Sequence, residues 1–380
     1  MKILLVGQWF VSEDNGKIVT PGGTERYVYG LAKQLQNDGY EVMVLSATMD
    51  KGETGFNELD VLNTYIFKAP AKFYGYSIDI LSFINTMKLV RRFNPDVVHV
   101  IATRYRFAAG AIAAAKIMKV KAVYTRTTLP HSEGRRRLSV LLDDWVFTRI
   151  IKRVDAIISL SREMSEILTQ QINPHNMVII PNPPVANYYK KVAKERNSIL
   201  FVGRLEIATK GIDLLIKALR HVQMEIPEVK LHVCGRGDDS SLDYLLKLVS
   251  KYRLEKNILF HGHLSDNELV DRYSNSEVIV LPYLAEGAVS YVLVEAMSAG
   301  LPVVAYDLDC FCEALGDGEF GVLVRKGDVK GLADQIVRLL KDAKLRGYYS
   351  KMSLKRSKEY SQETIVRRIE EVYSDLFEVT

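Results

Sequence analysis

The stretch that decides the fold runs from Leu281 to Val304 and reads LPYLAEGAVSYVLVEAMSAGLPVV. The apolar run from Val278 to Leu281 predicts a buried strand, and the turn after it holds an acid and a glycine. A helix with a second acid and small residues follows, and Gly300 and Pro302 end it. A helix N-terminus after a strand offers free amides and a positive dipole end to an anion. An acid in the same loop is then expected to bind hydroxyls, and phosphates with hydroxyls describe a nucleotide sugar.

This stretch resembles the signature of glycosyltransferase family 4, a large family of retaining nucleotide-sugar transferases. The family signature is an acid-glycine loop, seven residues, a second Glu, and a small-residue helix ending in Gly-Leu-Pro-Val-Val. Glu286 and Glu295 match the two acids, and Glu295 stands in the matching Glu-Ala-Met context. Eight residues separate the two acids here, so the extra residue falls in the loop between Gly287 and Tyr291. The alternative is a buried crossover in which Glu286 is an incidental surface acid.

The resemblance implies the GT-B fold, in which two Rossmann-like doubly wound α/β domains face each other across a cleft. The residues predict parallel sheets on their own account, because short apolar runs alternate with helical patterns in both halves. The strands expected in the first half are 2–6, 41–45, 97–100, 122–125 and 156–160, with helices at 25–37, 78–92 and 108–119. The strands expected in the second half are 198–202, 230–233, 258–260, 278–282 and 303–305.

The domain boundaries follow from these patterns. A chain of 380 residues is long enough for two domains. We expect an N-terminal, acceptor-side domain at 1–182, a Pro-rich and polar linker at 183–197, and a C-terminal, nucleotide-sugar-binding domain at 198–359. The amphipathic pattern within 360–380 predicts a terminal helix, and the resemblance implies that this helix completes the first domain.

Composition narrows the class of protein. Cys234, Cys310 and Cys312 are too few for a disulfide framework, and their spacing matches no zinc pattern. No apolar run is long enough to cross a bilayer, and the first residues lack the features of a signal peptide. These features predict a cytoplasmic protein. A pair of metal-binding acids is also missing from the sequence, which fits a metal-independent family, so we expect no metal or other cofactor.

Two cations are expected to hold the diphosphate. The strand 198–202 leads into Gly203 and Arg204, and Lys210 stands just before the next helix. Arg binds phosphate oxygens in pairs and Lys adds a mobile point charge, which together suit a departing nucleoside diphosphate. The spacing from Gly-Arg-Leu to Lys-Gly also matches the diphosphate-binding pair of the family. We therefore assign catalytic roles to Arg204, Lys210 and Glu286.

The remaining donor contacts are implied by the resemblance. Glu295 would hold the ribose hydroxyls, because a carboxylate accepts two hydrogen bonds from a vicinal diol. Glu286 and the loop amides would orient the sugar, and the base would lie between two glycine-rich turns. Gly22 and Gly23 match a glycine pair that closes on the donor phosphates or the acceptor, although a plain flexible turn is the alternative. The nucleotide-sugar-binding residues are Gly22, Gly23, Gly203, Arg236, Leu264, Gly287, Ala288, Val289, Ser290, Tyr291 and Glu295.

These features predict a retaining glycosyltransferase that moves a hexose from a nucleoside-diphosphate sugar, with UDP favoured by family frequency, to an acceptor hydroxyl on a lipid-linked or polysaccharide acceptor. Some departures from the family keep alternatives open. Thr127 stands where relatives often carry a histidine, with His131 nearby, and Glu313 alone matches an acid that usually follows paired glycines. A degenerate member that binds a nucleotide sugar without transfer, or a sugar-nucleotide epimerase, would share this architecture.

The net positive charge is concentrated in the first half of the chain. Residues 101–150 hold ten Lys and Arg against three Asp and Glu, which suggests an anionic partner. The segment 134–153 mixes basic with aromatic and aliphatic residues, while Arg104, Arg106 and Arg126 add charge nearby. A peripheral contact with an anionic membrane at the inner face is one interpretation. The other is a core helix packed on the sheet. We expect no nucleic-acid partner.

Overall fold

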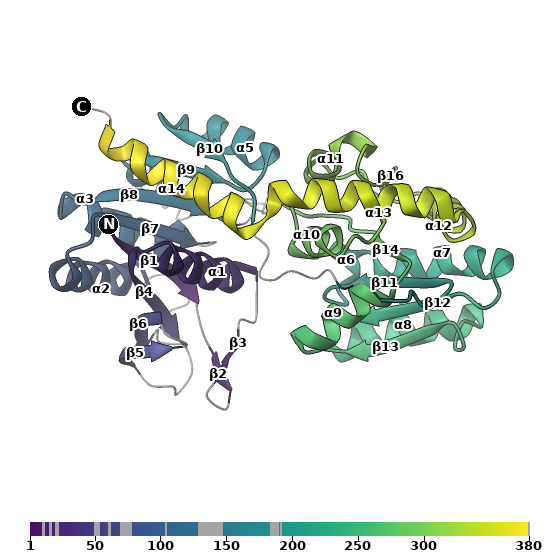
Figure 1. Cartoon of the computed structure of the whole chain (residues 1–380). Helices are drawn as coiled ribbons and strands as arrows, with labels where there is room; N and C mark the ends of the chain where they lie inside the picture. The colour runs from purple at the N-terminus through teal and green to yellow at the C-terminus, as the bar shows by residue number, and fades with distance from the viewer. Residues whose placement is uncertain are drawn as a thin grey trace. The chain divides into compact units, whose positions relative to one another are not determined.

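The structure is a computed structural model, and it describes residues 1–9, 12–14, 17–19, 23–48, 54–59, 62–68, 78–102, 105–127, 147–182, 190 and 192–378. The chain divides into two compact units (Figure 1). One consists of Met1–Val185 with Gln362–Thr380, and the other of Ala186–Ser361. Most of the expected linker, residues 183–189 and 191, lies outside the described residues.

The N-terminal unit is built on a sheet with strand order β10-β9-β8-β7-β1-β4-β6-β5. Its strands are β1 (Lys2–Trp9), β4 (Glu41–Thr48), β5 (Gly55–Leu59), β6 (Leu62–Lys68), β7 (Val97–Ala102), β8 (Lys121–Arg126), β9 (Ala156–Ser159) and β10 (Met177–Ile179). A separate hairpin pairs β2 (Ser12–Asp14) with β3 (Lys17–Val19). The helices are α1 (Gly23–Asn37), α2 (Ile78–Phe93), α3 (Tyr105–Ile117), α5 (Arg162–Ile172) and α14 (Gln362–Glu378).

The expectation of an entirely parallel first sheet is wrong at one edge. β5 pairs antiparallel with β6, whereas the remaining pairs of this sheet run parallel. Only residues 60 and 61 separate these two strands, and so short a connection can join antiparallel strands but not parallel ones. The sequence analysis did not find β5, β6 or β10, which are short or mix polar with apolar residues.

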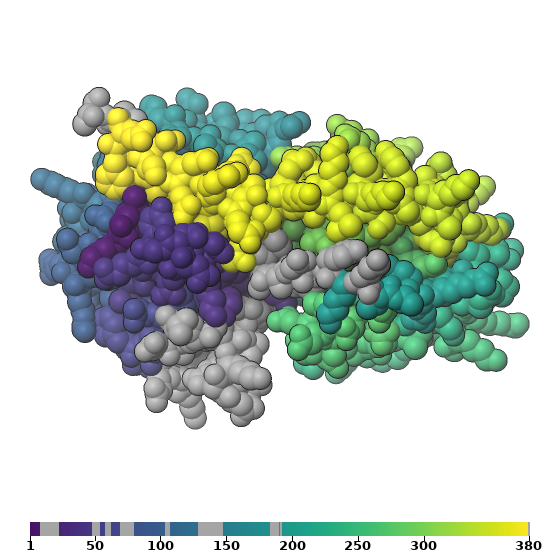
Figure 2. All heavy atoms as spheres, viewed as in Figure 1, coloured from purple at the N-terminus to yellow at the C-terminus, as the bar shows by residue number. Residues whose placement is uncertain are grey.

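The terminal helix α14 packs on the N-terminal unit, where it lies beside α1 (Figures 1 and 2). The Gln362 side chain donates a hydrogen bond to the Gly30 carbonyl at 2.8 Å. His99, buried within β7, bonds Tyr373 of α14 through Nδ1 at 2.6 Å and Thr125 of β8 through Nε2 at 2.7 Å. A buried polar network thus fastens the end of the chain to the middle of the first sheet.

The C-terminal unit has a parallel sheet with strand order β13-β12-β11-β14-β15-β16. Its strands are β11 (Ser198–Val202), β12 (Lys230–Cys234), β13 (Ile258–Gly262), β14 (Val278–Leu281), β15 (Val303–Tyr306) and β16 (Val322–Val324). Its α-helices are α6 (Ile207–Lys210), α7 (Ile212–Glu225), α8 (Asp239–Tyr252), α9 (Asp266–Asn275), α10 (Tyr291–Ser298), α11 (Asp309–Leu315), α12 (Val329–Lys341) and α13 (Ala343–Ser357).

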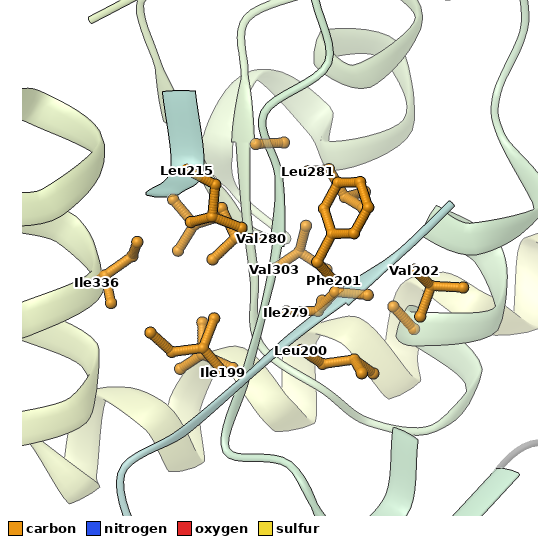
Figure 3. Packing of buried hydrophobic residues seen from close by; sticks show 14 of the residues in the cluster. Ile199, Leu200, Phe201, Val202, Leu215, Ile279, Val280, Leu281, Val303 and Ile336 are labelled. Atoms are coloured by element: carbon orange, nitrogen blue, oxygen red, sulfur yellow. The ribbon is translucent and has the colours of Figure 1, made fainter. Parts of the chain in front are cut away.

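The core of this unit forms around β11 and β14. All residues of both strands are buried, as expected for parallel strands covered on both faces by helices. Figure 3 shows Ile199 of β11 and Val280 of β14 on the side of Leu215 of α7 and Ile336 of α12, and Leu200 beside Ile279. Burying a large aliphatic or aromatic side chain stabilises a fold by roughly 1.5–3 kcal/mol. The loops at the strand ends are therefore anchored to a well-packed core.

Candidate active site

The candidate site lies at the carboxyl edge of the C-terminal sheet. The strand order changes direction between β11 and β14, since the chain moves outward through β12 and β13 before it returns on the other side of β11. Ligands of open α/β sheets bind outside the carboxyl ends of the strands at such a switch point. Arg204 lies in the loop after β11, Lys210 ends the short helix α6 that follows it, and the loop after β14 carries Glu286.

Close backbone contacts fix these loops against one another. A Cβ atom at Gly235 would lie 1.8 Å from the Gly203 carbonyl oxygen, and one at Gly211 would lie 2.0 Å from the Pro282 carbonyl oxygen. The φ angles of Gly235 and Gly211 are 148° and 60°. Glycine is therefore required at both positions, both because a Cβ atom would not fit and because of the backbone conformation. The amide of Gly235 also donates to the Gly262 carbonyl at 2.7 Å, which adds the end of β13. The ends of four strands thus form one backbone platform.

Lys210 and Glu286 meet on this platform. Lys210 Nζ lies 2.5 Å from Glu286 Oε2, and the two side chains are 14% and 24% exposed. The same ammonium lies 3.9 Å from the ring centroid of Tyr283. The Tyr283 hydroxyl donates to the Val202 carbonyl at 3.0 Å, and burial raises the pKa of this phenol. Tyr283 therefore stays neutral and presents its ring face to the cation.

Helix α11 supports this pair. Cys310 Sγ lies 3.6 Å from the Glu286 carbonyl oxygen and donates to it, and the Phe311 ring lies 5.6 Å from the Tyr283 ring. Both side chains are buried. They belong to the segment that departs from the paired glycines of the family, so the unusual residues contact the loop after β14, which carries Glu286 and Tyr283.

Arg204 lies at the same edge but has a different environment. Its side chain is 76% exposed, and Nη2 lies 3.1 Å from Glu206 Oε2. Arg236 is exposed and Leu264 is half-buried, at the ends of β12 and β13. Nearby histidines pair with each other: His232 Nδ1 and His261 Nε2 are 2.9 Å apart. Burial lowers the pKa of both imidazoles.

Glu295 is buried in α10, with 1% of its surface exposed. Tyr273 of α9 donates a hydrogen bond to Glu295 Oε2 at 2.8 Å, which orients the carboxylate. Ser290 is the N-cap of α10, and its hydroxyl accepts a hydrogen bond from the Leu293 amide at 3.2 Å. In the loop before the helix, Gly287 and Tyr291 are half-buried, whereas Ala288 and Val289 are buried, which leaves their backbone as the part that a ligand could contact.

The sequence analysis missed two aromatic residues of this site. Tyr273 and Tyr283 contact Glu295 and Lys210, yet each reads as an ordinary core residue in its own helix or strand-end pattern. The Tyr283 position, two residues after β14 and three before Glu286, is the one signal that places it beside the signature acid.

Other expected residues belong to the N-terminal unit. Gly23 is the first residue of α1, and Thr24 Oγ1 of the next residue donates to Thr127 Oγ1 at 3.2 Å. Gly22 and His131 lie outside the described residues. Within the part of the chain that the structure describes, no group of three or more His, Cys, Asp or Glu side chains is arranged to hold a metal ion.

The expected membrane segment is described only at its end, because 134–146 lie outside the described residues. Phe147 and Ile151 are buried in the core of the N-terminal unit. The expectation that Arg126 adds surface charge is wrong, since this residue at the end of β8 is 1% exposed. In the described ranges no helix combines the length and apolar character needed to cross a membrane.

Two models of glycosyltransferase families match the chain. The family model Glycosyltransferase Family 4 matches residues 21–183, and the model Glycosyl transferases group 1 matches residues 189–356. The chain is a member of glycosyltransferase family 4. Together the two matches extend from residue 21 to residue 356 of this glycosyltransferase, apart from residues 184–188.

Relatives of this glycosyltransferase act on different molecules. It is 27% identical over 368 residues to a phosphatidyl-myo-inositol mannosyltransferase of Mycolicibacterium smegmatis, covering 93% of this chain and 90% of that one. It is 29% identical over 268 residues to a glycogen synthase of Mycobacterium tuberculosis, covering 66% of this chain and 62% of that one.

Solved structures show the GT-B fold. A sucrose-phosphate synthase of Thermosynechococcus elongatus superposes with a TM-score of 0.79 at 20% identity, over 100% of both chains. HepE of Anabaena, solved in complex with UDP, gives a TM-score of 0.79 at 19% identity, over 99% of this glycosyltransferase and 100% of that chain. At these identities the likeness concerns the fold alone.

Proposed function

We propose that this glycosyltransferase transfers a hexose from a nucleoside-diphosphate sugar, foremost a UDP-sugar, to an acceptor hydroxyl with retention of anomeric configuration. The observation that carries the proposal is the Lys210–Glu286 pair at the switch point between β11 and β14. A half-buried cation suits a diphosphate, and a carboxylate beside it suits sugar hydroxyls. Retention and the UDP preference rest on the family.

In this proposal the donor lies on residues 198–359, and residues 1–182 with 360–380 serve the acceptor. Lys210 exchanges its contact with Glu286 for the diphosphate, and the exposed Arg204 side chain closes on the same phosphates. Glu286, freed from the cation, and the amides of 287–291 orient the sugar. Glu295, held by Tyr273, accepts hydrogen bonds from the ribose hydroxyls.

The proposed reaction breaks the bond between the anomeric carbon and the diphosphate oxygen. The acceptor hydroxyl forms the new bond on the same face and gives its proton to the departing phosphate. Lys210 and Arg204 neutralise the charge that develops on that phosphate, which is where fixed cations lower a barrier most. No metal ion is required in this scheme.

The acceptor is proposed from the relatives. One relative is named for mannosyl transfer to phosphatidyl-myo-inositol and another for glycogen synthesis. A lipid-linked acceptor and a polysaccharide are therefore the two classes to test, and the former would place the enzyme at the cytoplasmic face of a membrane.

The experiment combines binding with turnover. Thermal unfolding with a panel of nucleotides and nucleotide sugars identifies the donor, because a ligand that binds only the folded state raises Tm. Release of nucleoside diphosphate is then followed with phosphatidylinositol or a glucan as acceptor, and NMR of the product gives the anomer. Tight binding without turnover of any donor would instead indicate a degenerate binding protein, and an inverted anomer would refute retention.

A further inference from the structure

The positive charge of the C-terminal unit is gathered near its end. Residues 198–324 hold 11 Lys and Arg against 19 Asp and Glu, whereas α13 holds five Lys and Arg and no acid. This helix lies at the surface of the unit (Figures 1 and 2). So uneven a distribution creates a local positive potential, which attracts an anionic partner.

Two of the five cations hold α13 on its own unit. Arg346 Nη2 lies 2.9 Å from Glu277 Oε1, and the other terminal nitrogen donates to two carbonyl oxygens in the last turn of α12. Arg356 donates to the carbonyl oxygens of Glu313 and Ala314, both at 2.9 Å. The arginines therefore have a structural role, which the three lysines of the helix do not share.

The three lysines lie in one row with a tyrosine. We call this row the α13 stripe, and its members are Lys344, Tyr348, Lys351 and Lys355. They are spaced by four, three and four residues, so they fall within about 60° of the helix circumference. All four side chains are exposed, and the buried Ser353 lies on the opposite face of the helix.

The α13 stripe is not needed by the helix itself. Lys344 stands in the first turn, where a cation opposes the helix dipole. Lys355 lies 4.0 Å from Glu319, and both side chains are more than half exposed, so this contact contributes little to stability. Tyr348 is 50% exposed, and its ring lies edge-on at 5.2 Å from Tyr349, which packs on the core. The stripe thus presents cations on both sides of a supported aromatic ring.

The stripe is separate from the candidate active site. The Ser353 hydroxyl donates to the Leu301 carbonyl at 3.1 Å, and Leu301 lies just before β15. Glu277, the ion-pair partner of α13, directly precedes β14. The helix therefore crosses the amino edge of the C-terminal sheet, whereas Arg204, Lys210 and Glu286 lie at the carboxyl edge. A molecule bound to the stripe would leave the donor site free.

We propose that the α13 stripe binds an acidic polysaccharide, a glycan chain that carries anionic groups along its length. The three lysines would contact successive anionic groups over about 16 Å of helix, and the Tyr348 ring would pack on the apolar face of a sugar between them. The inference rests on the proposed function in naming a glycan, and it adds that the acceptor polymer is anionic and is held at a second site.

The residues of α13 favour a glycan over other anionic partners. A bilayer surface calls for exposed aliphatic side chains beside the cations, but Tyr348 is the only exposed large hydrophobic residue of α13, a helix that the structure describes throughout. Arginine is the preferred residue for nucleic-acid phosphates, and both arginines of α13 contact their own unit. A single row of lysines suits one extended chain.

Fluorescence anisotropy of labelled oligosaccharides, with the full chain and no sugar donor, tests the proposal. The probes are oligogalacturonate and heparin oligosaccharide, which are acidic, and a neutral malto-oligosaccharide. The wild type should bind the two acidic probes but not the neutral one, and salt should weaken this binding. Lys344→Gln/Lys351→Gln/Lys355→Gln should weaken it by about 10-fold, since each exposed charge contact contributes about a factor of two. Tyr348→Ala should weaken it at low and high salt alike, and Tyr348→Phe should bind like the wild type.

The matched control is Lys247→Gln/Lys251→Gln/Lys256→Gln, which removes three exposed lysines from α8 and the turn after it and should leave binding unchanged. Thermal unfolding confirms that each variant is folded. Failure of the wild type to bind either acidic probe at low salt would overturn the proposal, as would equal binding by the stripe and control variants. So would tighter, stripe-dependent binding of single-stranded DNA or of phosphatidylglycerol vesicles. Because the assay contains no donor, a wild type that binds the acidic probes but transfers no sugar would refute the proposed function alone.

Discussion

Tyr283 is the residue that most distinguishes this site, because its ring lies against the Lys210 ammonium while its hydroxyl is fixed to β11. A desolvated cation–π contact contributes roughly 0.5–2 kcal/mol, so Tyr283→Leu should lower turnover by about 2- to 30-fold through misplacement of Lys210. Tyr283→Phe keeps the ring and loses only one hydrogen bond, so it should retain most activity at a cost of about 1 kcal/mol in stability. Turnover at saturating donor, with urea unfolding, separates the two effects. Equal turnover in the Leu and Phe variants would show that the ring has no positioning role.

Single residues also show where sequence reasoning stops. The sequence placed Lys210 and Glu286 in one site but in separate roles, and the structure puts them in contact. Their partners Tyr283 and Cys310 could not be predicted, because these contacts depend on the path of the loops between strands rather than on a period or motif. The signature loop, which has one extra residue, also receives a part-buried contact from Cys310 of α11 at the Glu286 carbonyl.

At the scale of elements, α14 is held to the first sheet through a histidine that must remain neutral. Burial lowers the pKa of His99 to about 3, from about 6.5 in an unfolded chain. Between about pH 6.5 and pH 3, the His99 side chain therefore binds a proton in the unfolded state but not in the folded state. The stability linked to His99 is complete above pH 6.5 and falls by about 1.4 kcal/mol per unit as pH drops toward 3.

This prediction is measured by urea unfolding between neutral pH and about pH 5, where the loss linked to His99 should reach about 2 kcal/mol. His99→Gln should be less stable at neutral pH but should lose this part of the pH dependence. His175→Gln, at an exposed position, is the matched control and should keep the wild-type slope. A slope in His99→Gln as steep as in the wild type would contradict the assignment.

Elements differed in how well the sequence predicted them. β11 and β14 are continuous runs of buried apolar residues bounded by glycine or proline, and their predicted and observed positions agree to within a residue. β6 alternates buried residues with exposed Asn63 and Lys68, and β10 and β16 are only three residues long. Such strands form because an existing sheet offers an edge, so their own sequence contains little signal.

At the scale of the whole molecule, a diphosphate that is neutralised by side chains needs no metal ion. In the proposed mechanism Lys210 and Arg204 supply the positive charge that other transferases take from a divalent cation, so a strong chelator should leave turnover unchanged. The assay compares wild-type turnover before and after chelation, and then with added magnesium or manganese. Activity that disappears with the chelator and returns with either metal would show that the two cations are not sufficient.

The central claim is that Lys210 and Arg204 stabilise the departing diphosphate. The most direct measurement is turnover of the donor found in the thermal-unfolding panel by Lys210→Ala, Arg204→Ala and the control Lys341→Ala. Lys341 also forms an ion pair, with Glu225 at 2.6 Å, but Glu225 ends α7 and so lies toward the opposite edge of the sheet. We predict a loss on the order of 100-fold in each of the first two variants, with unchanged folding, and full activity in the control. Wild-type rates in Lys210→Ala and Arg204→Ala would contradict the account.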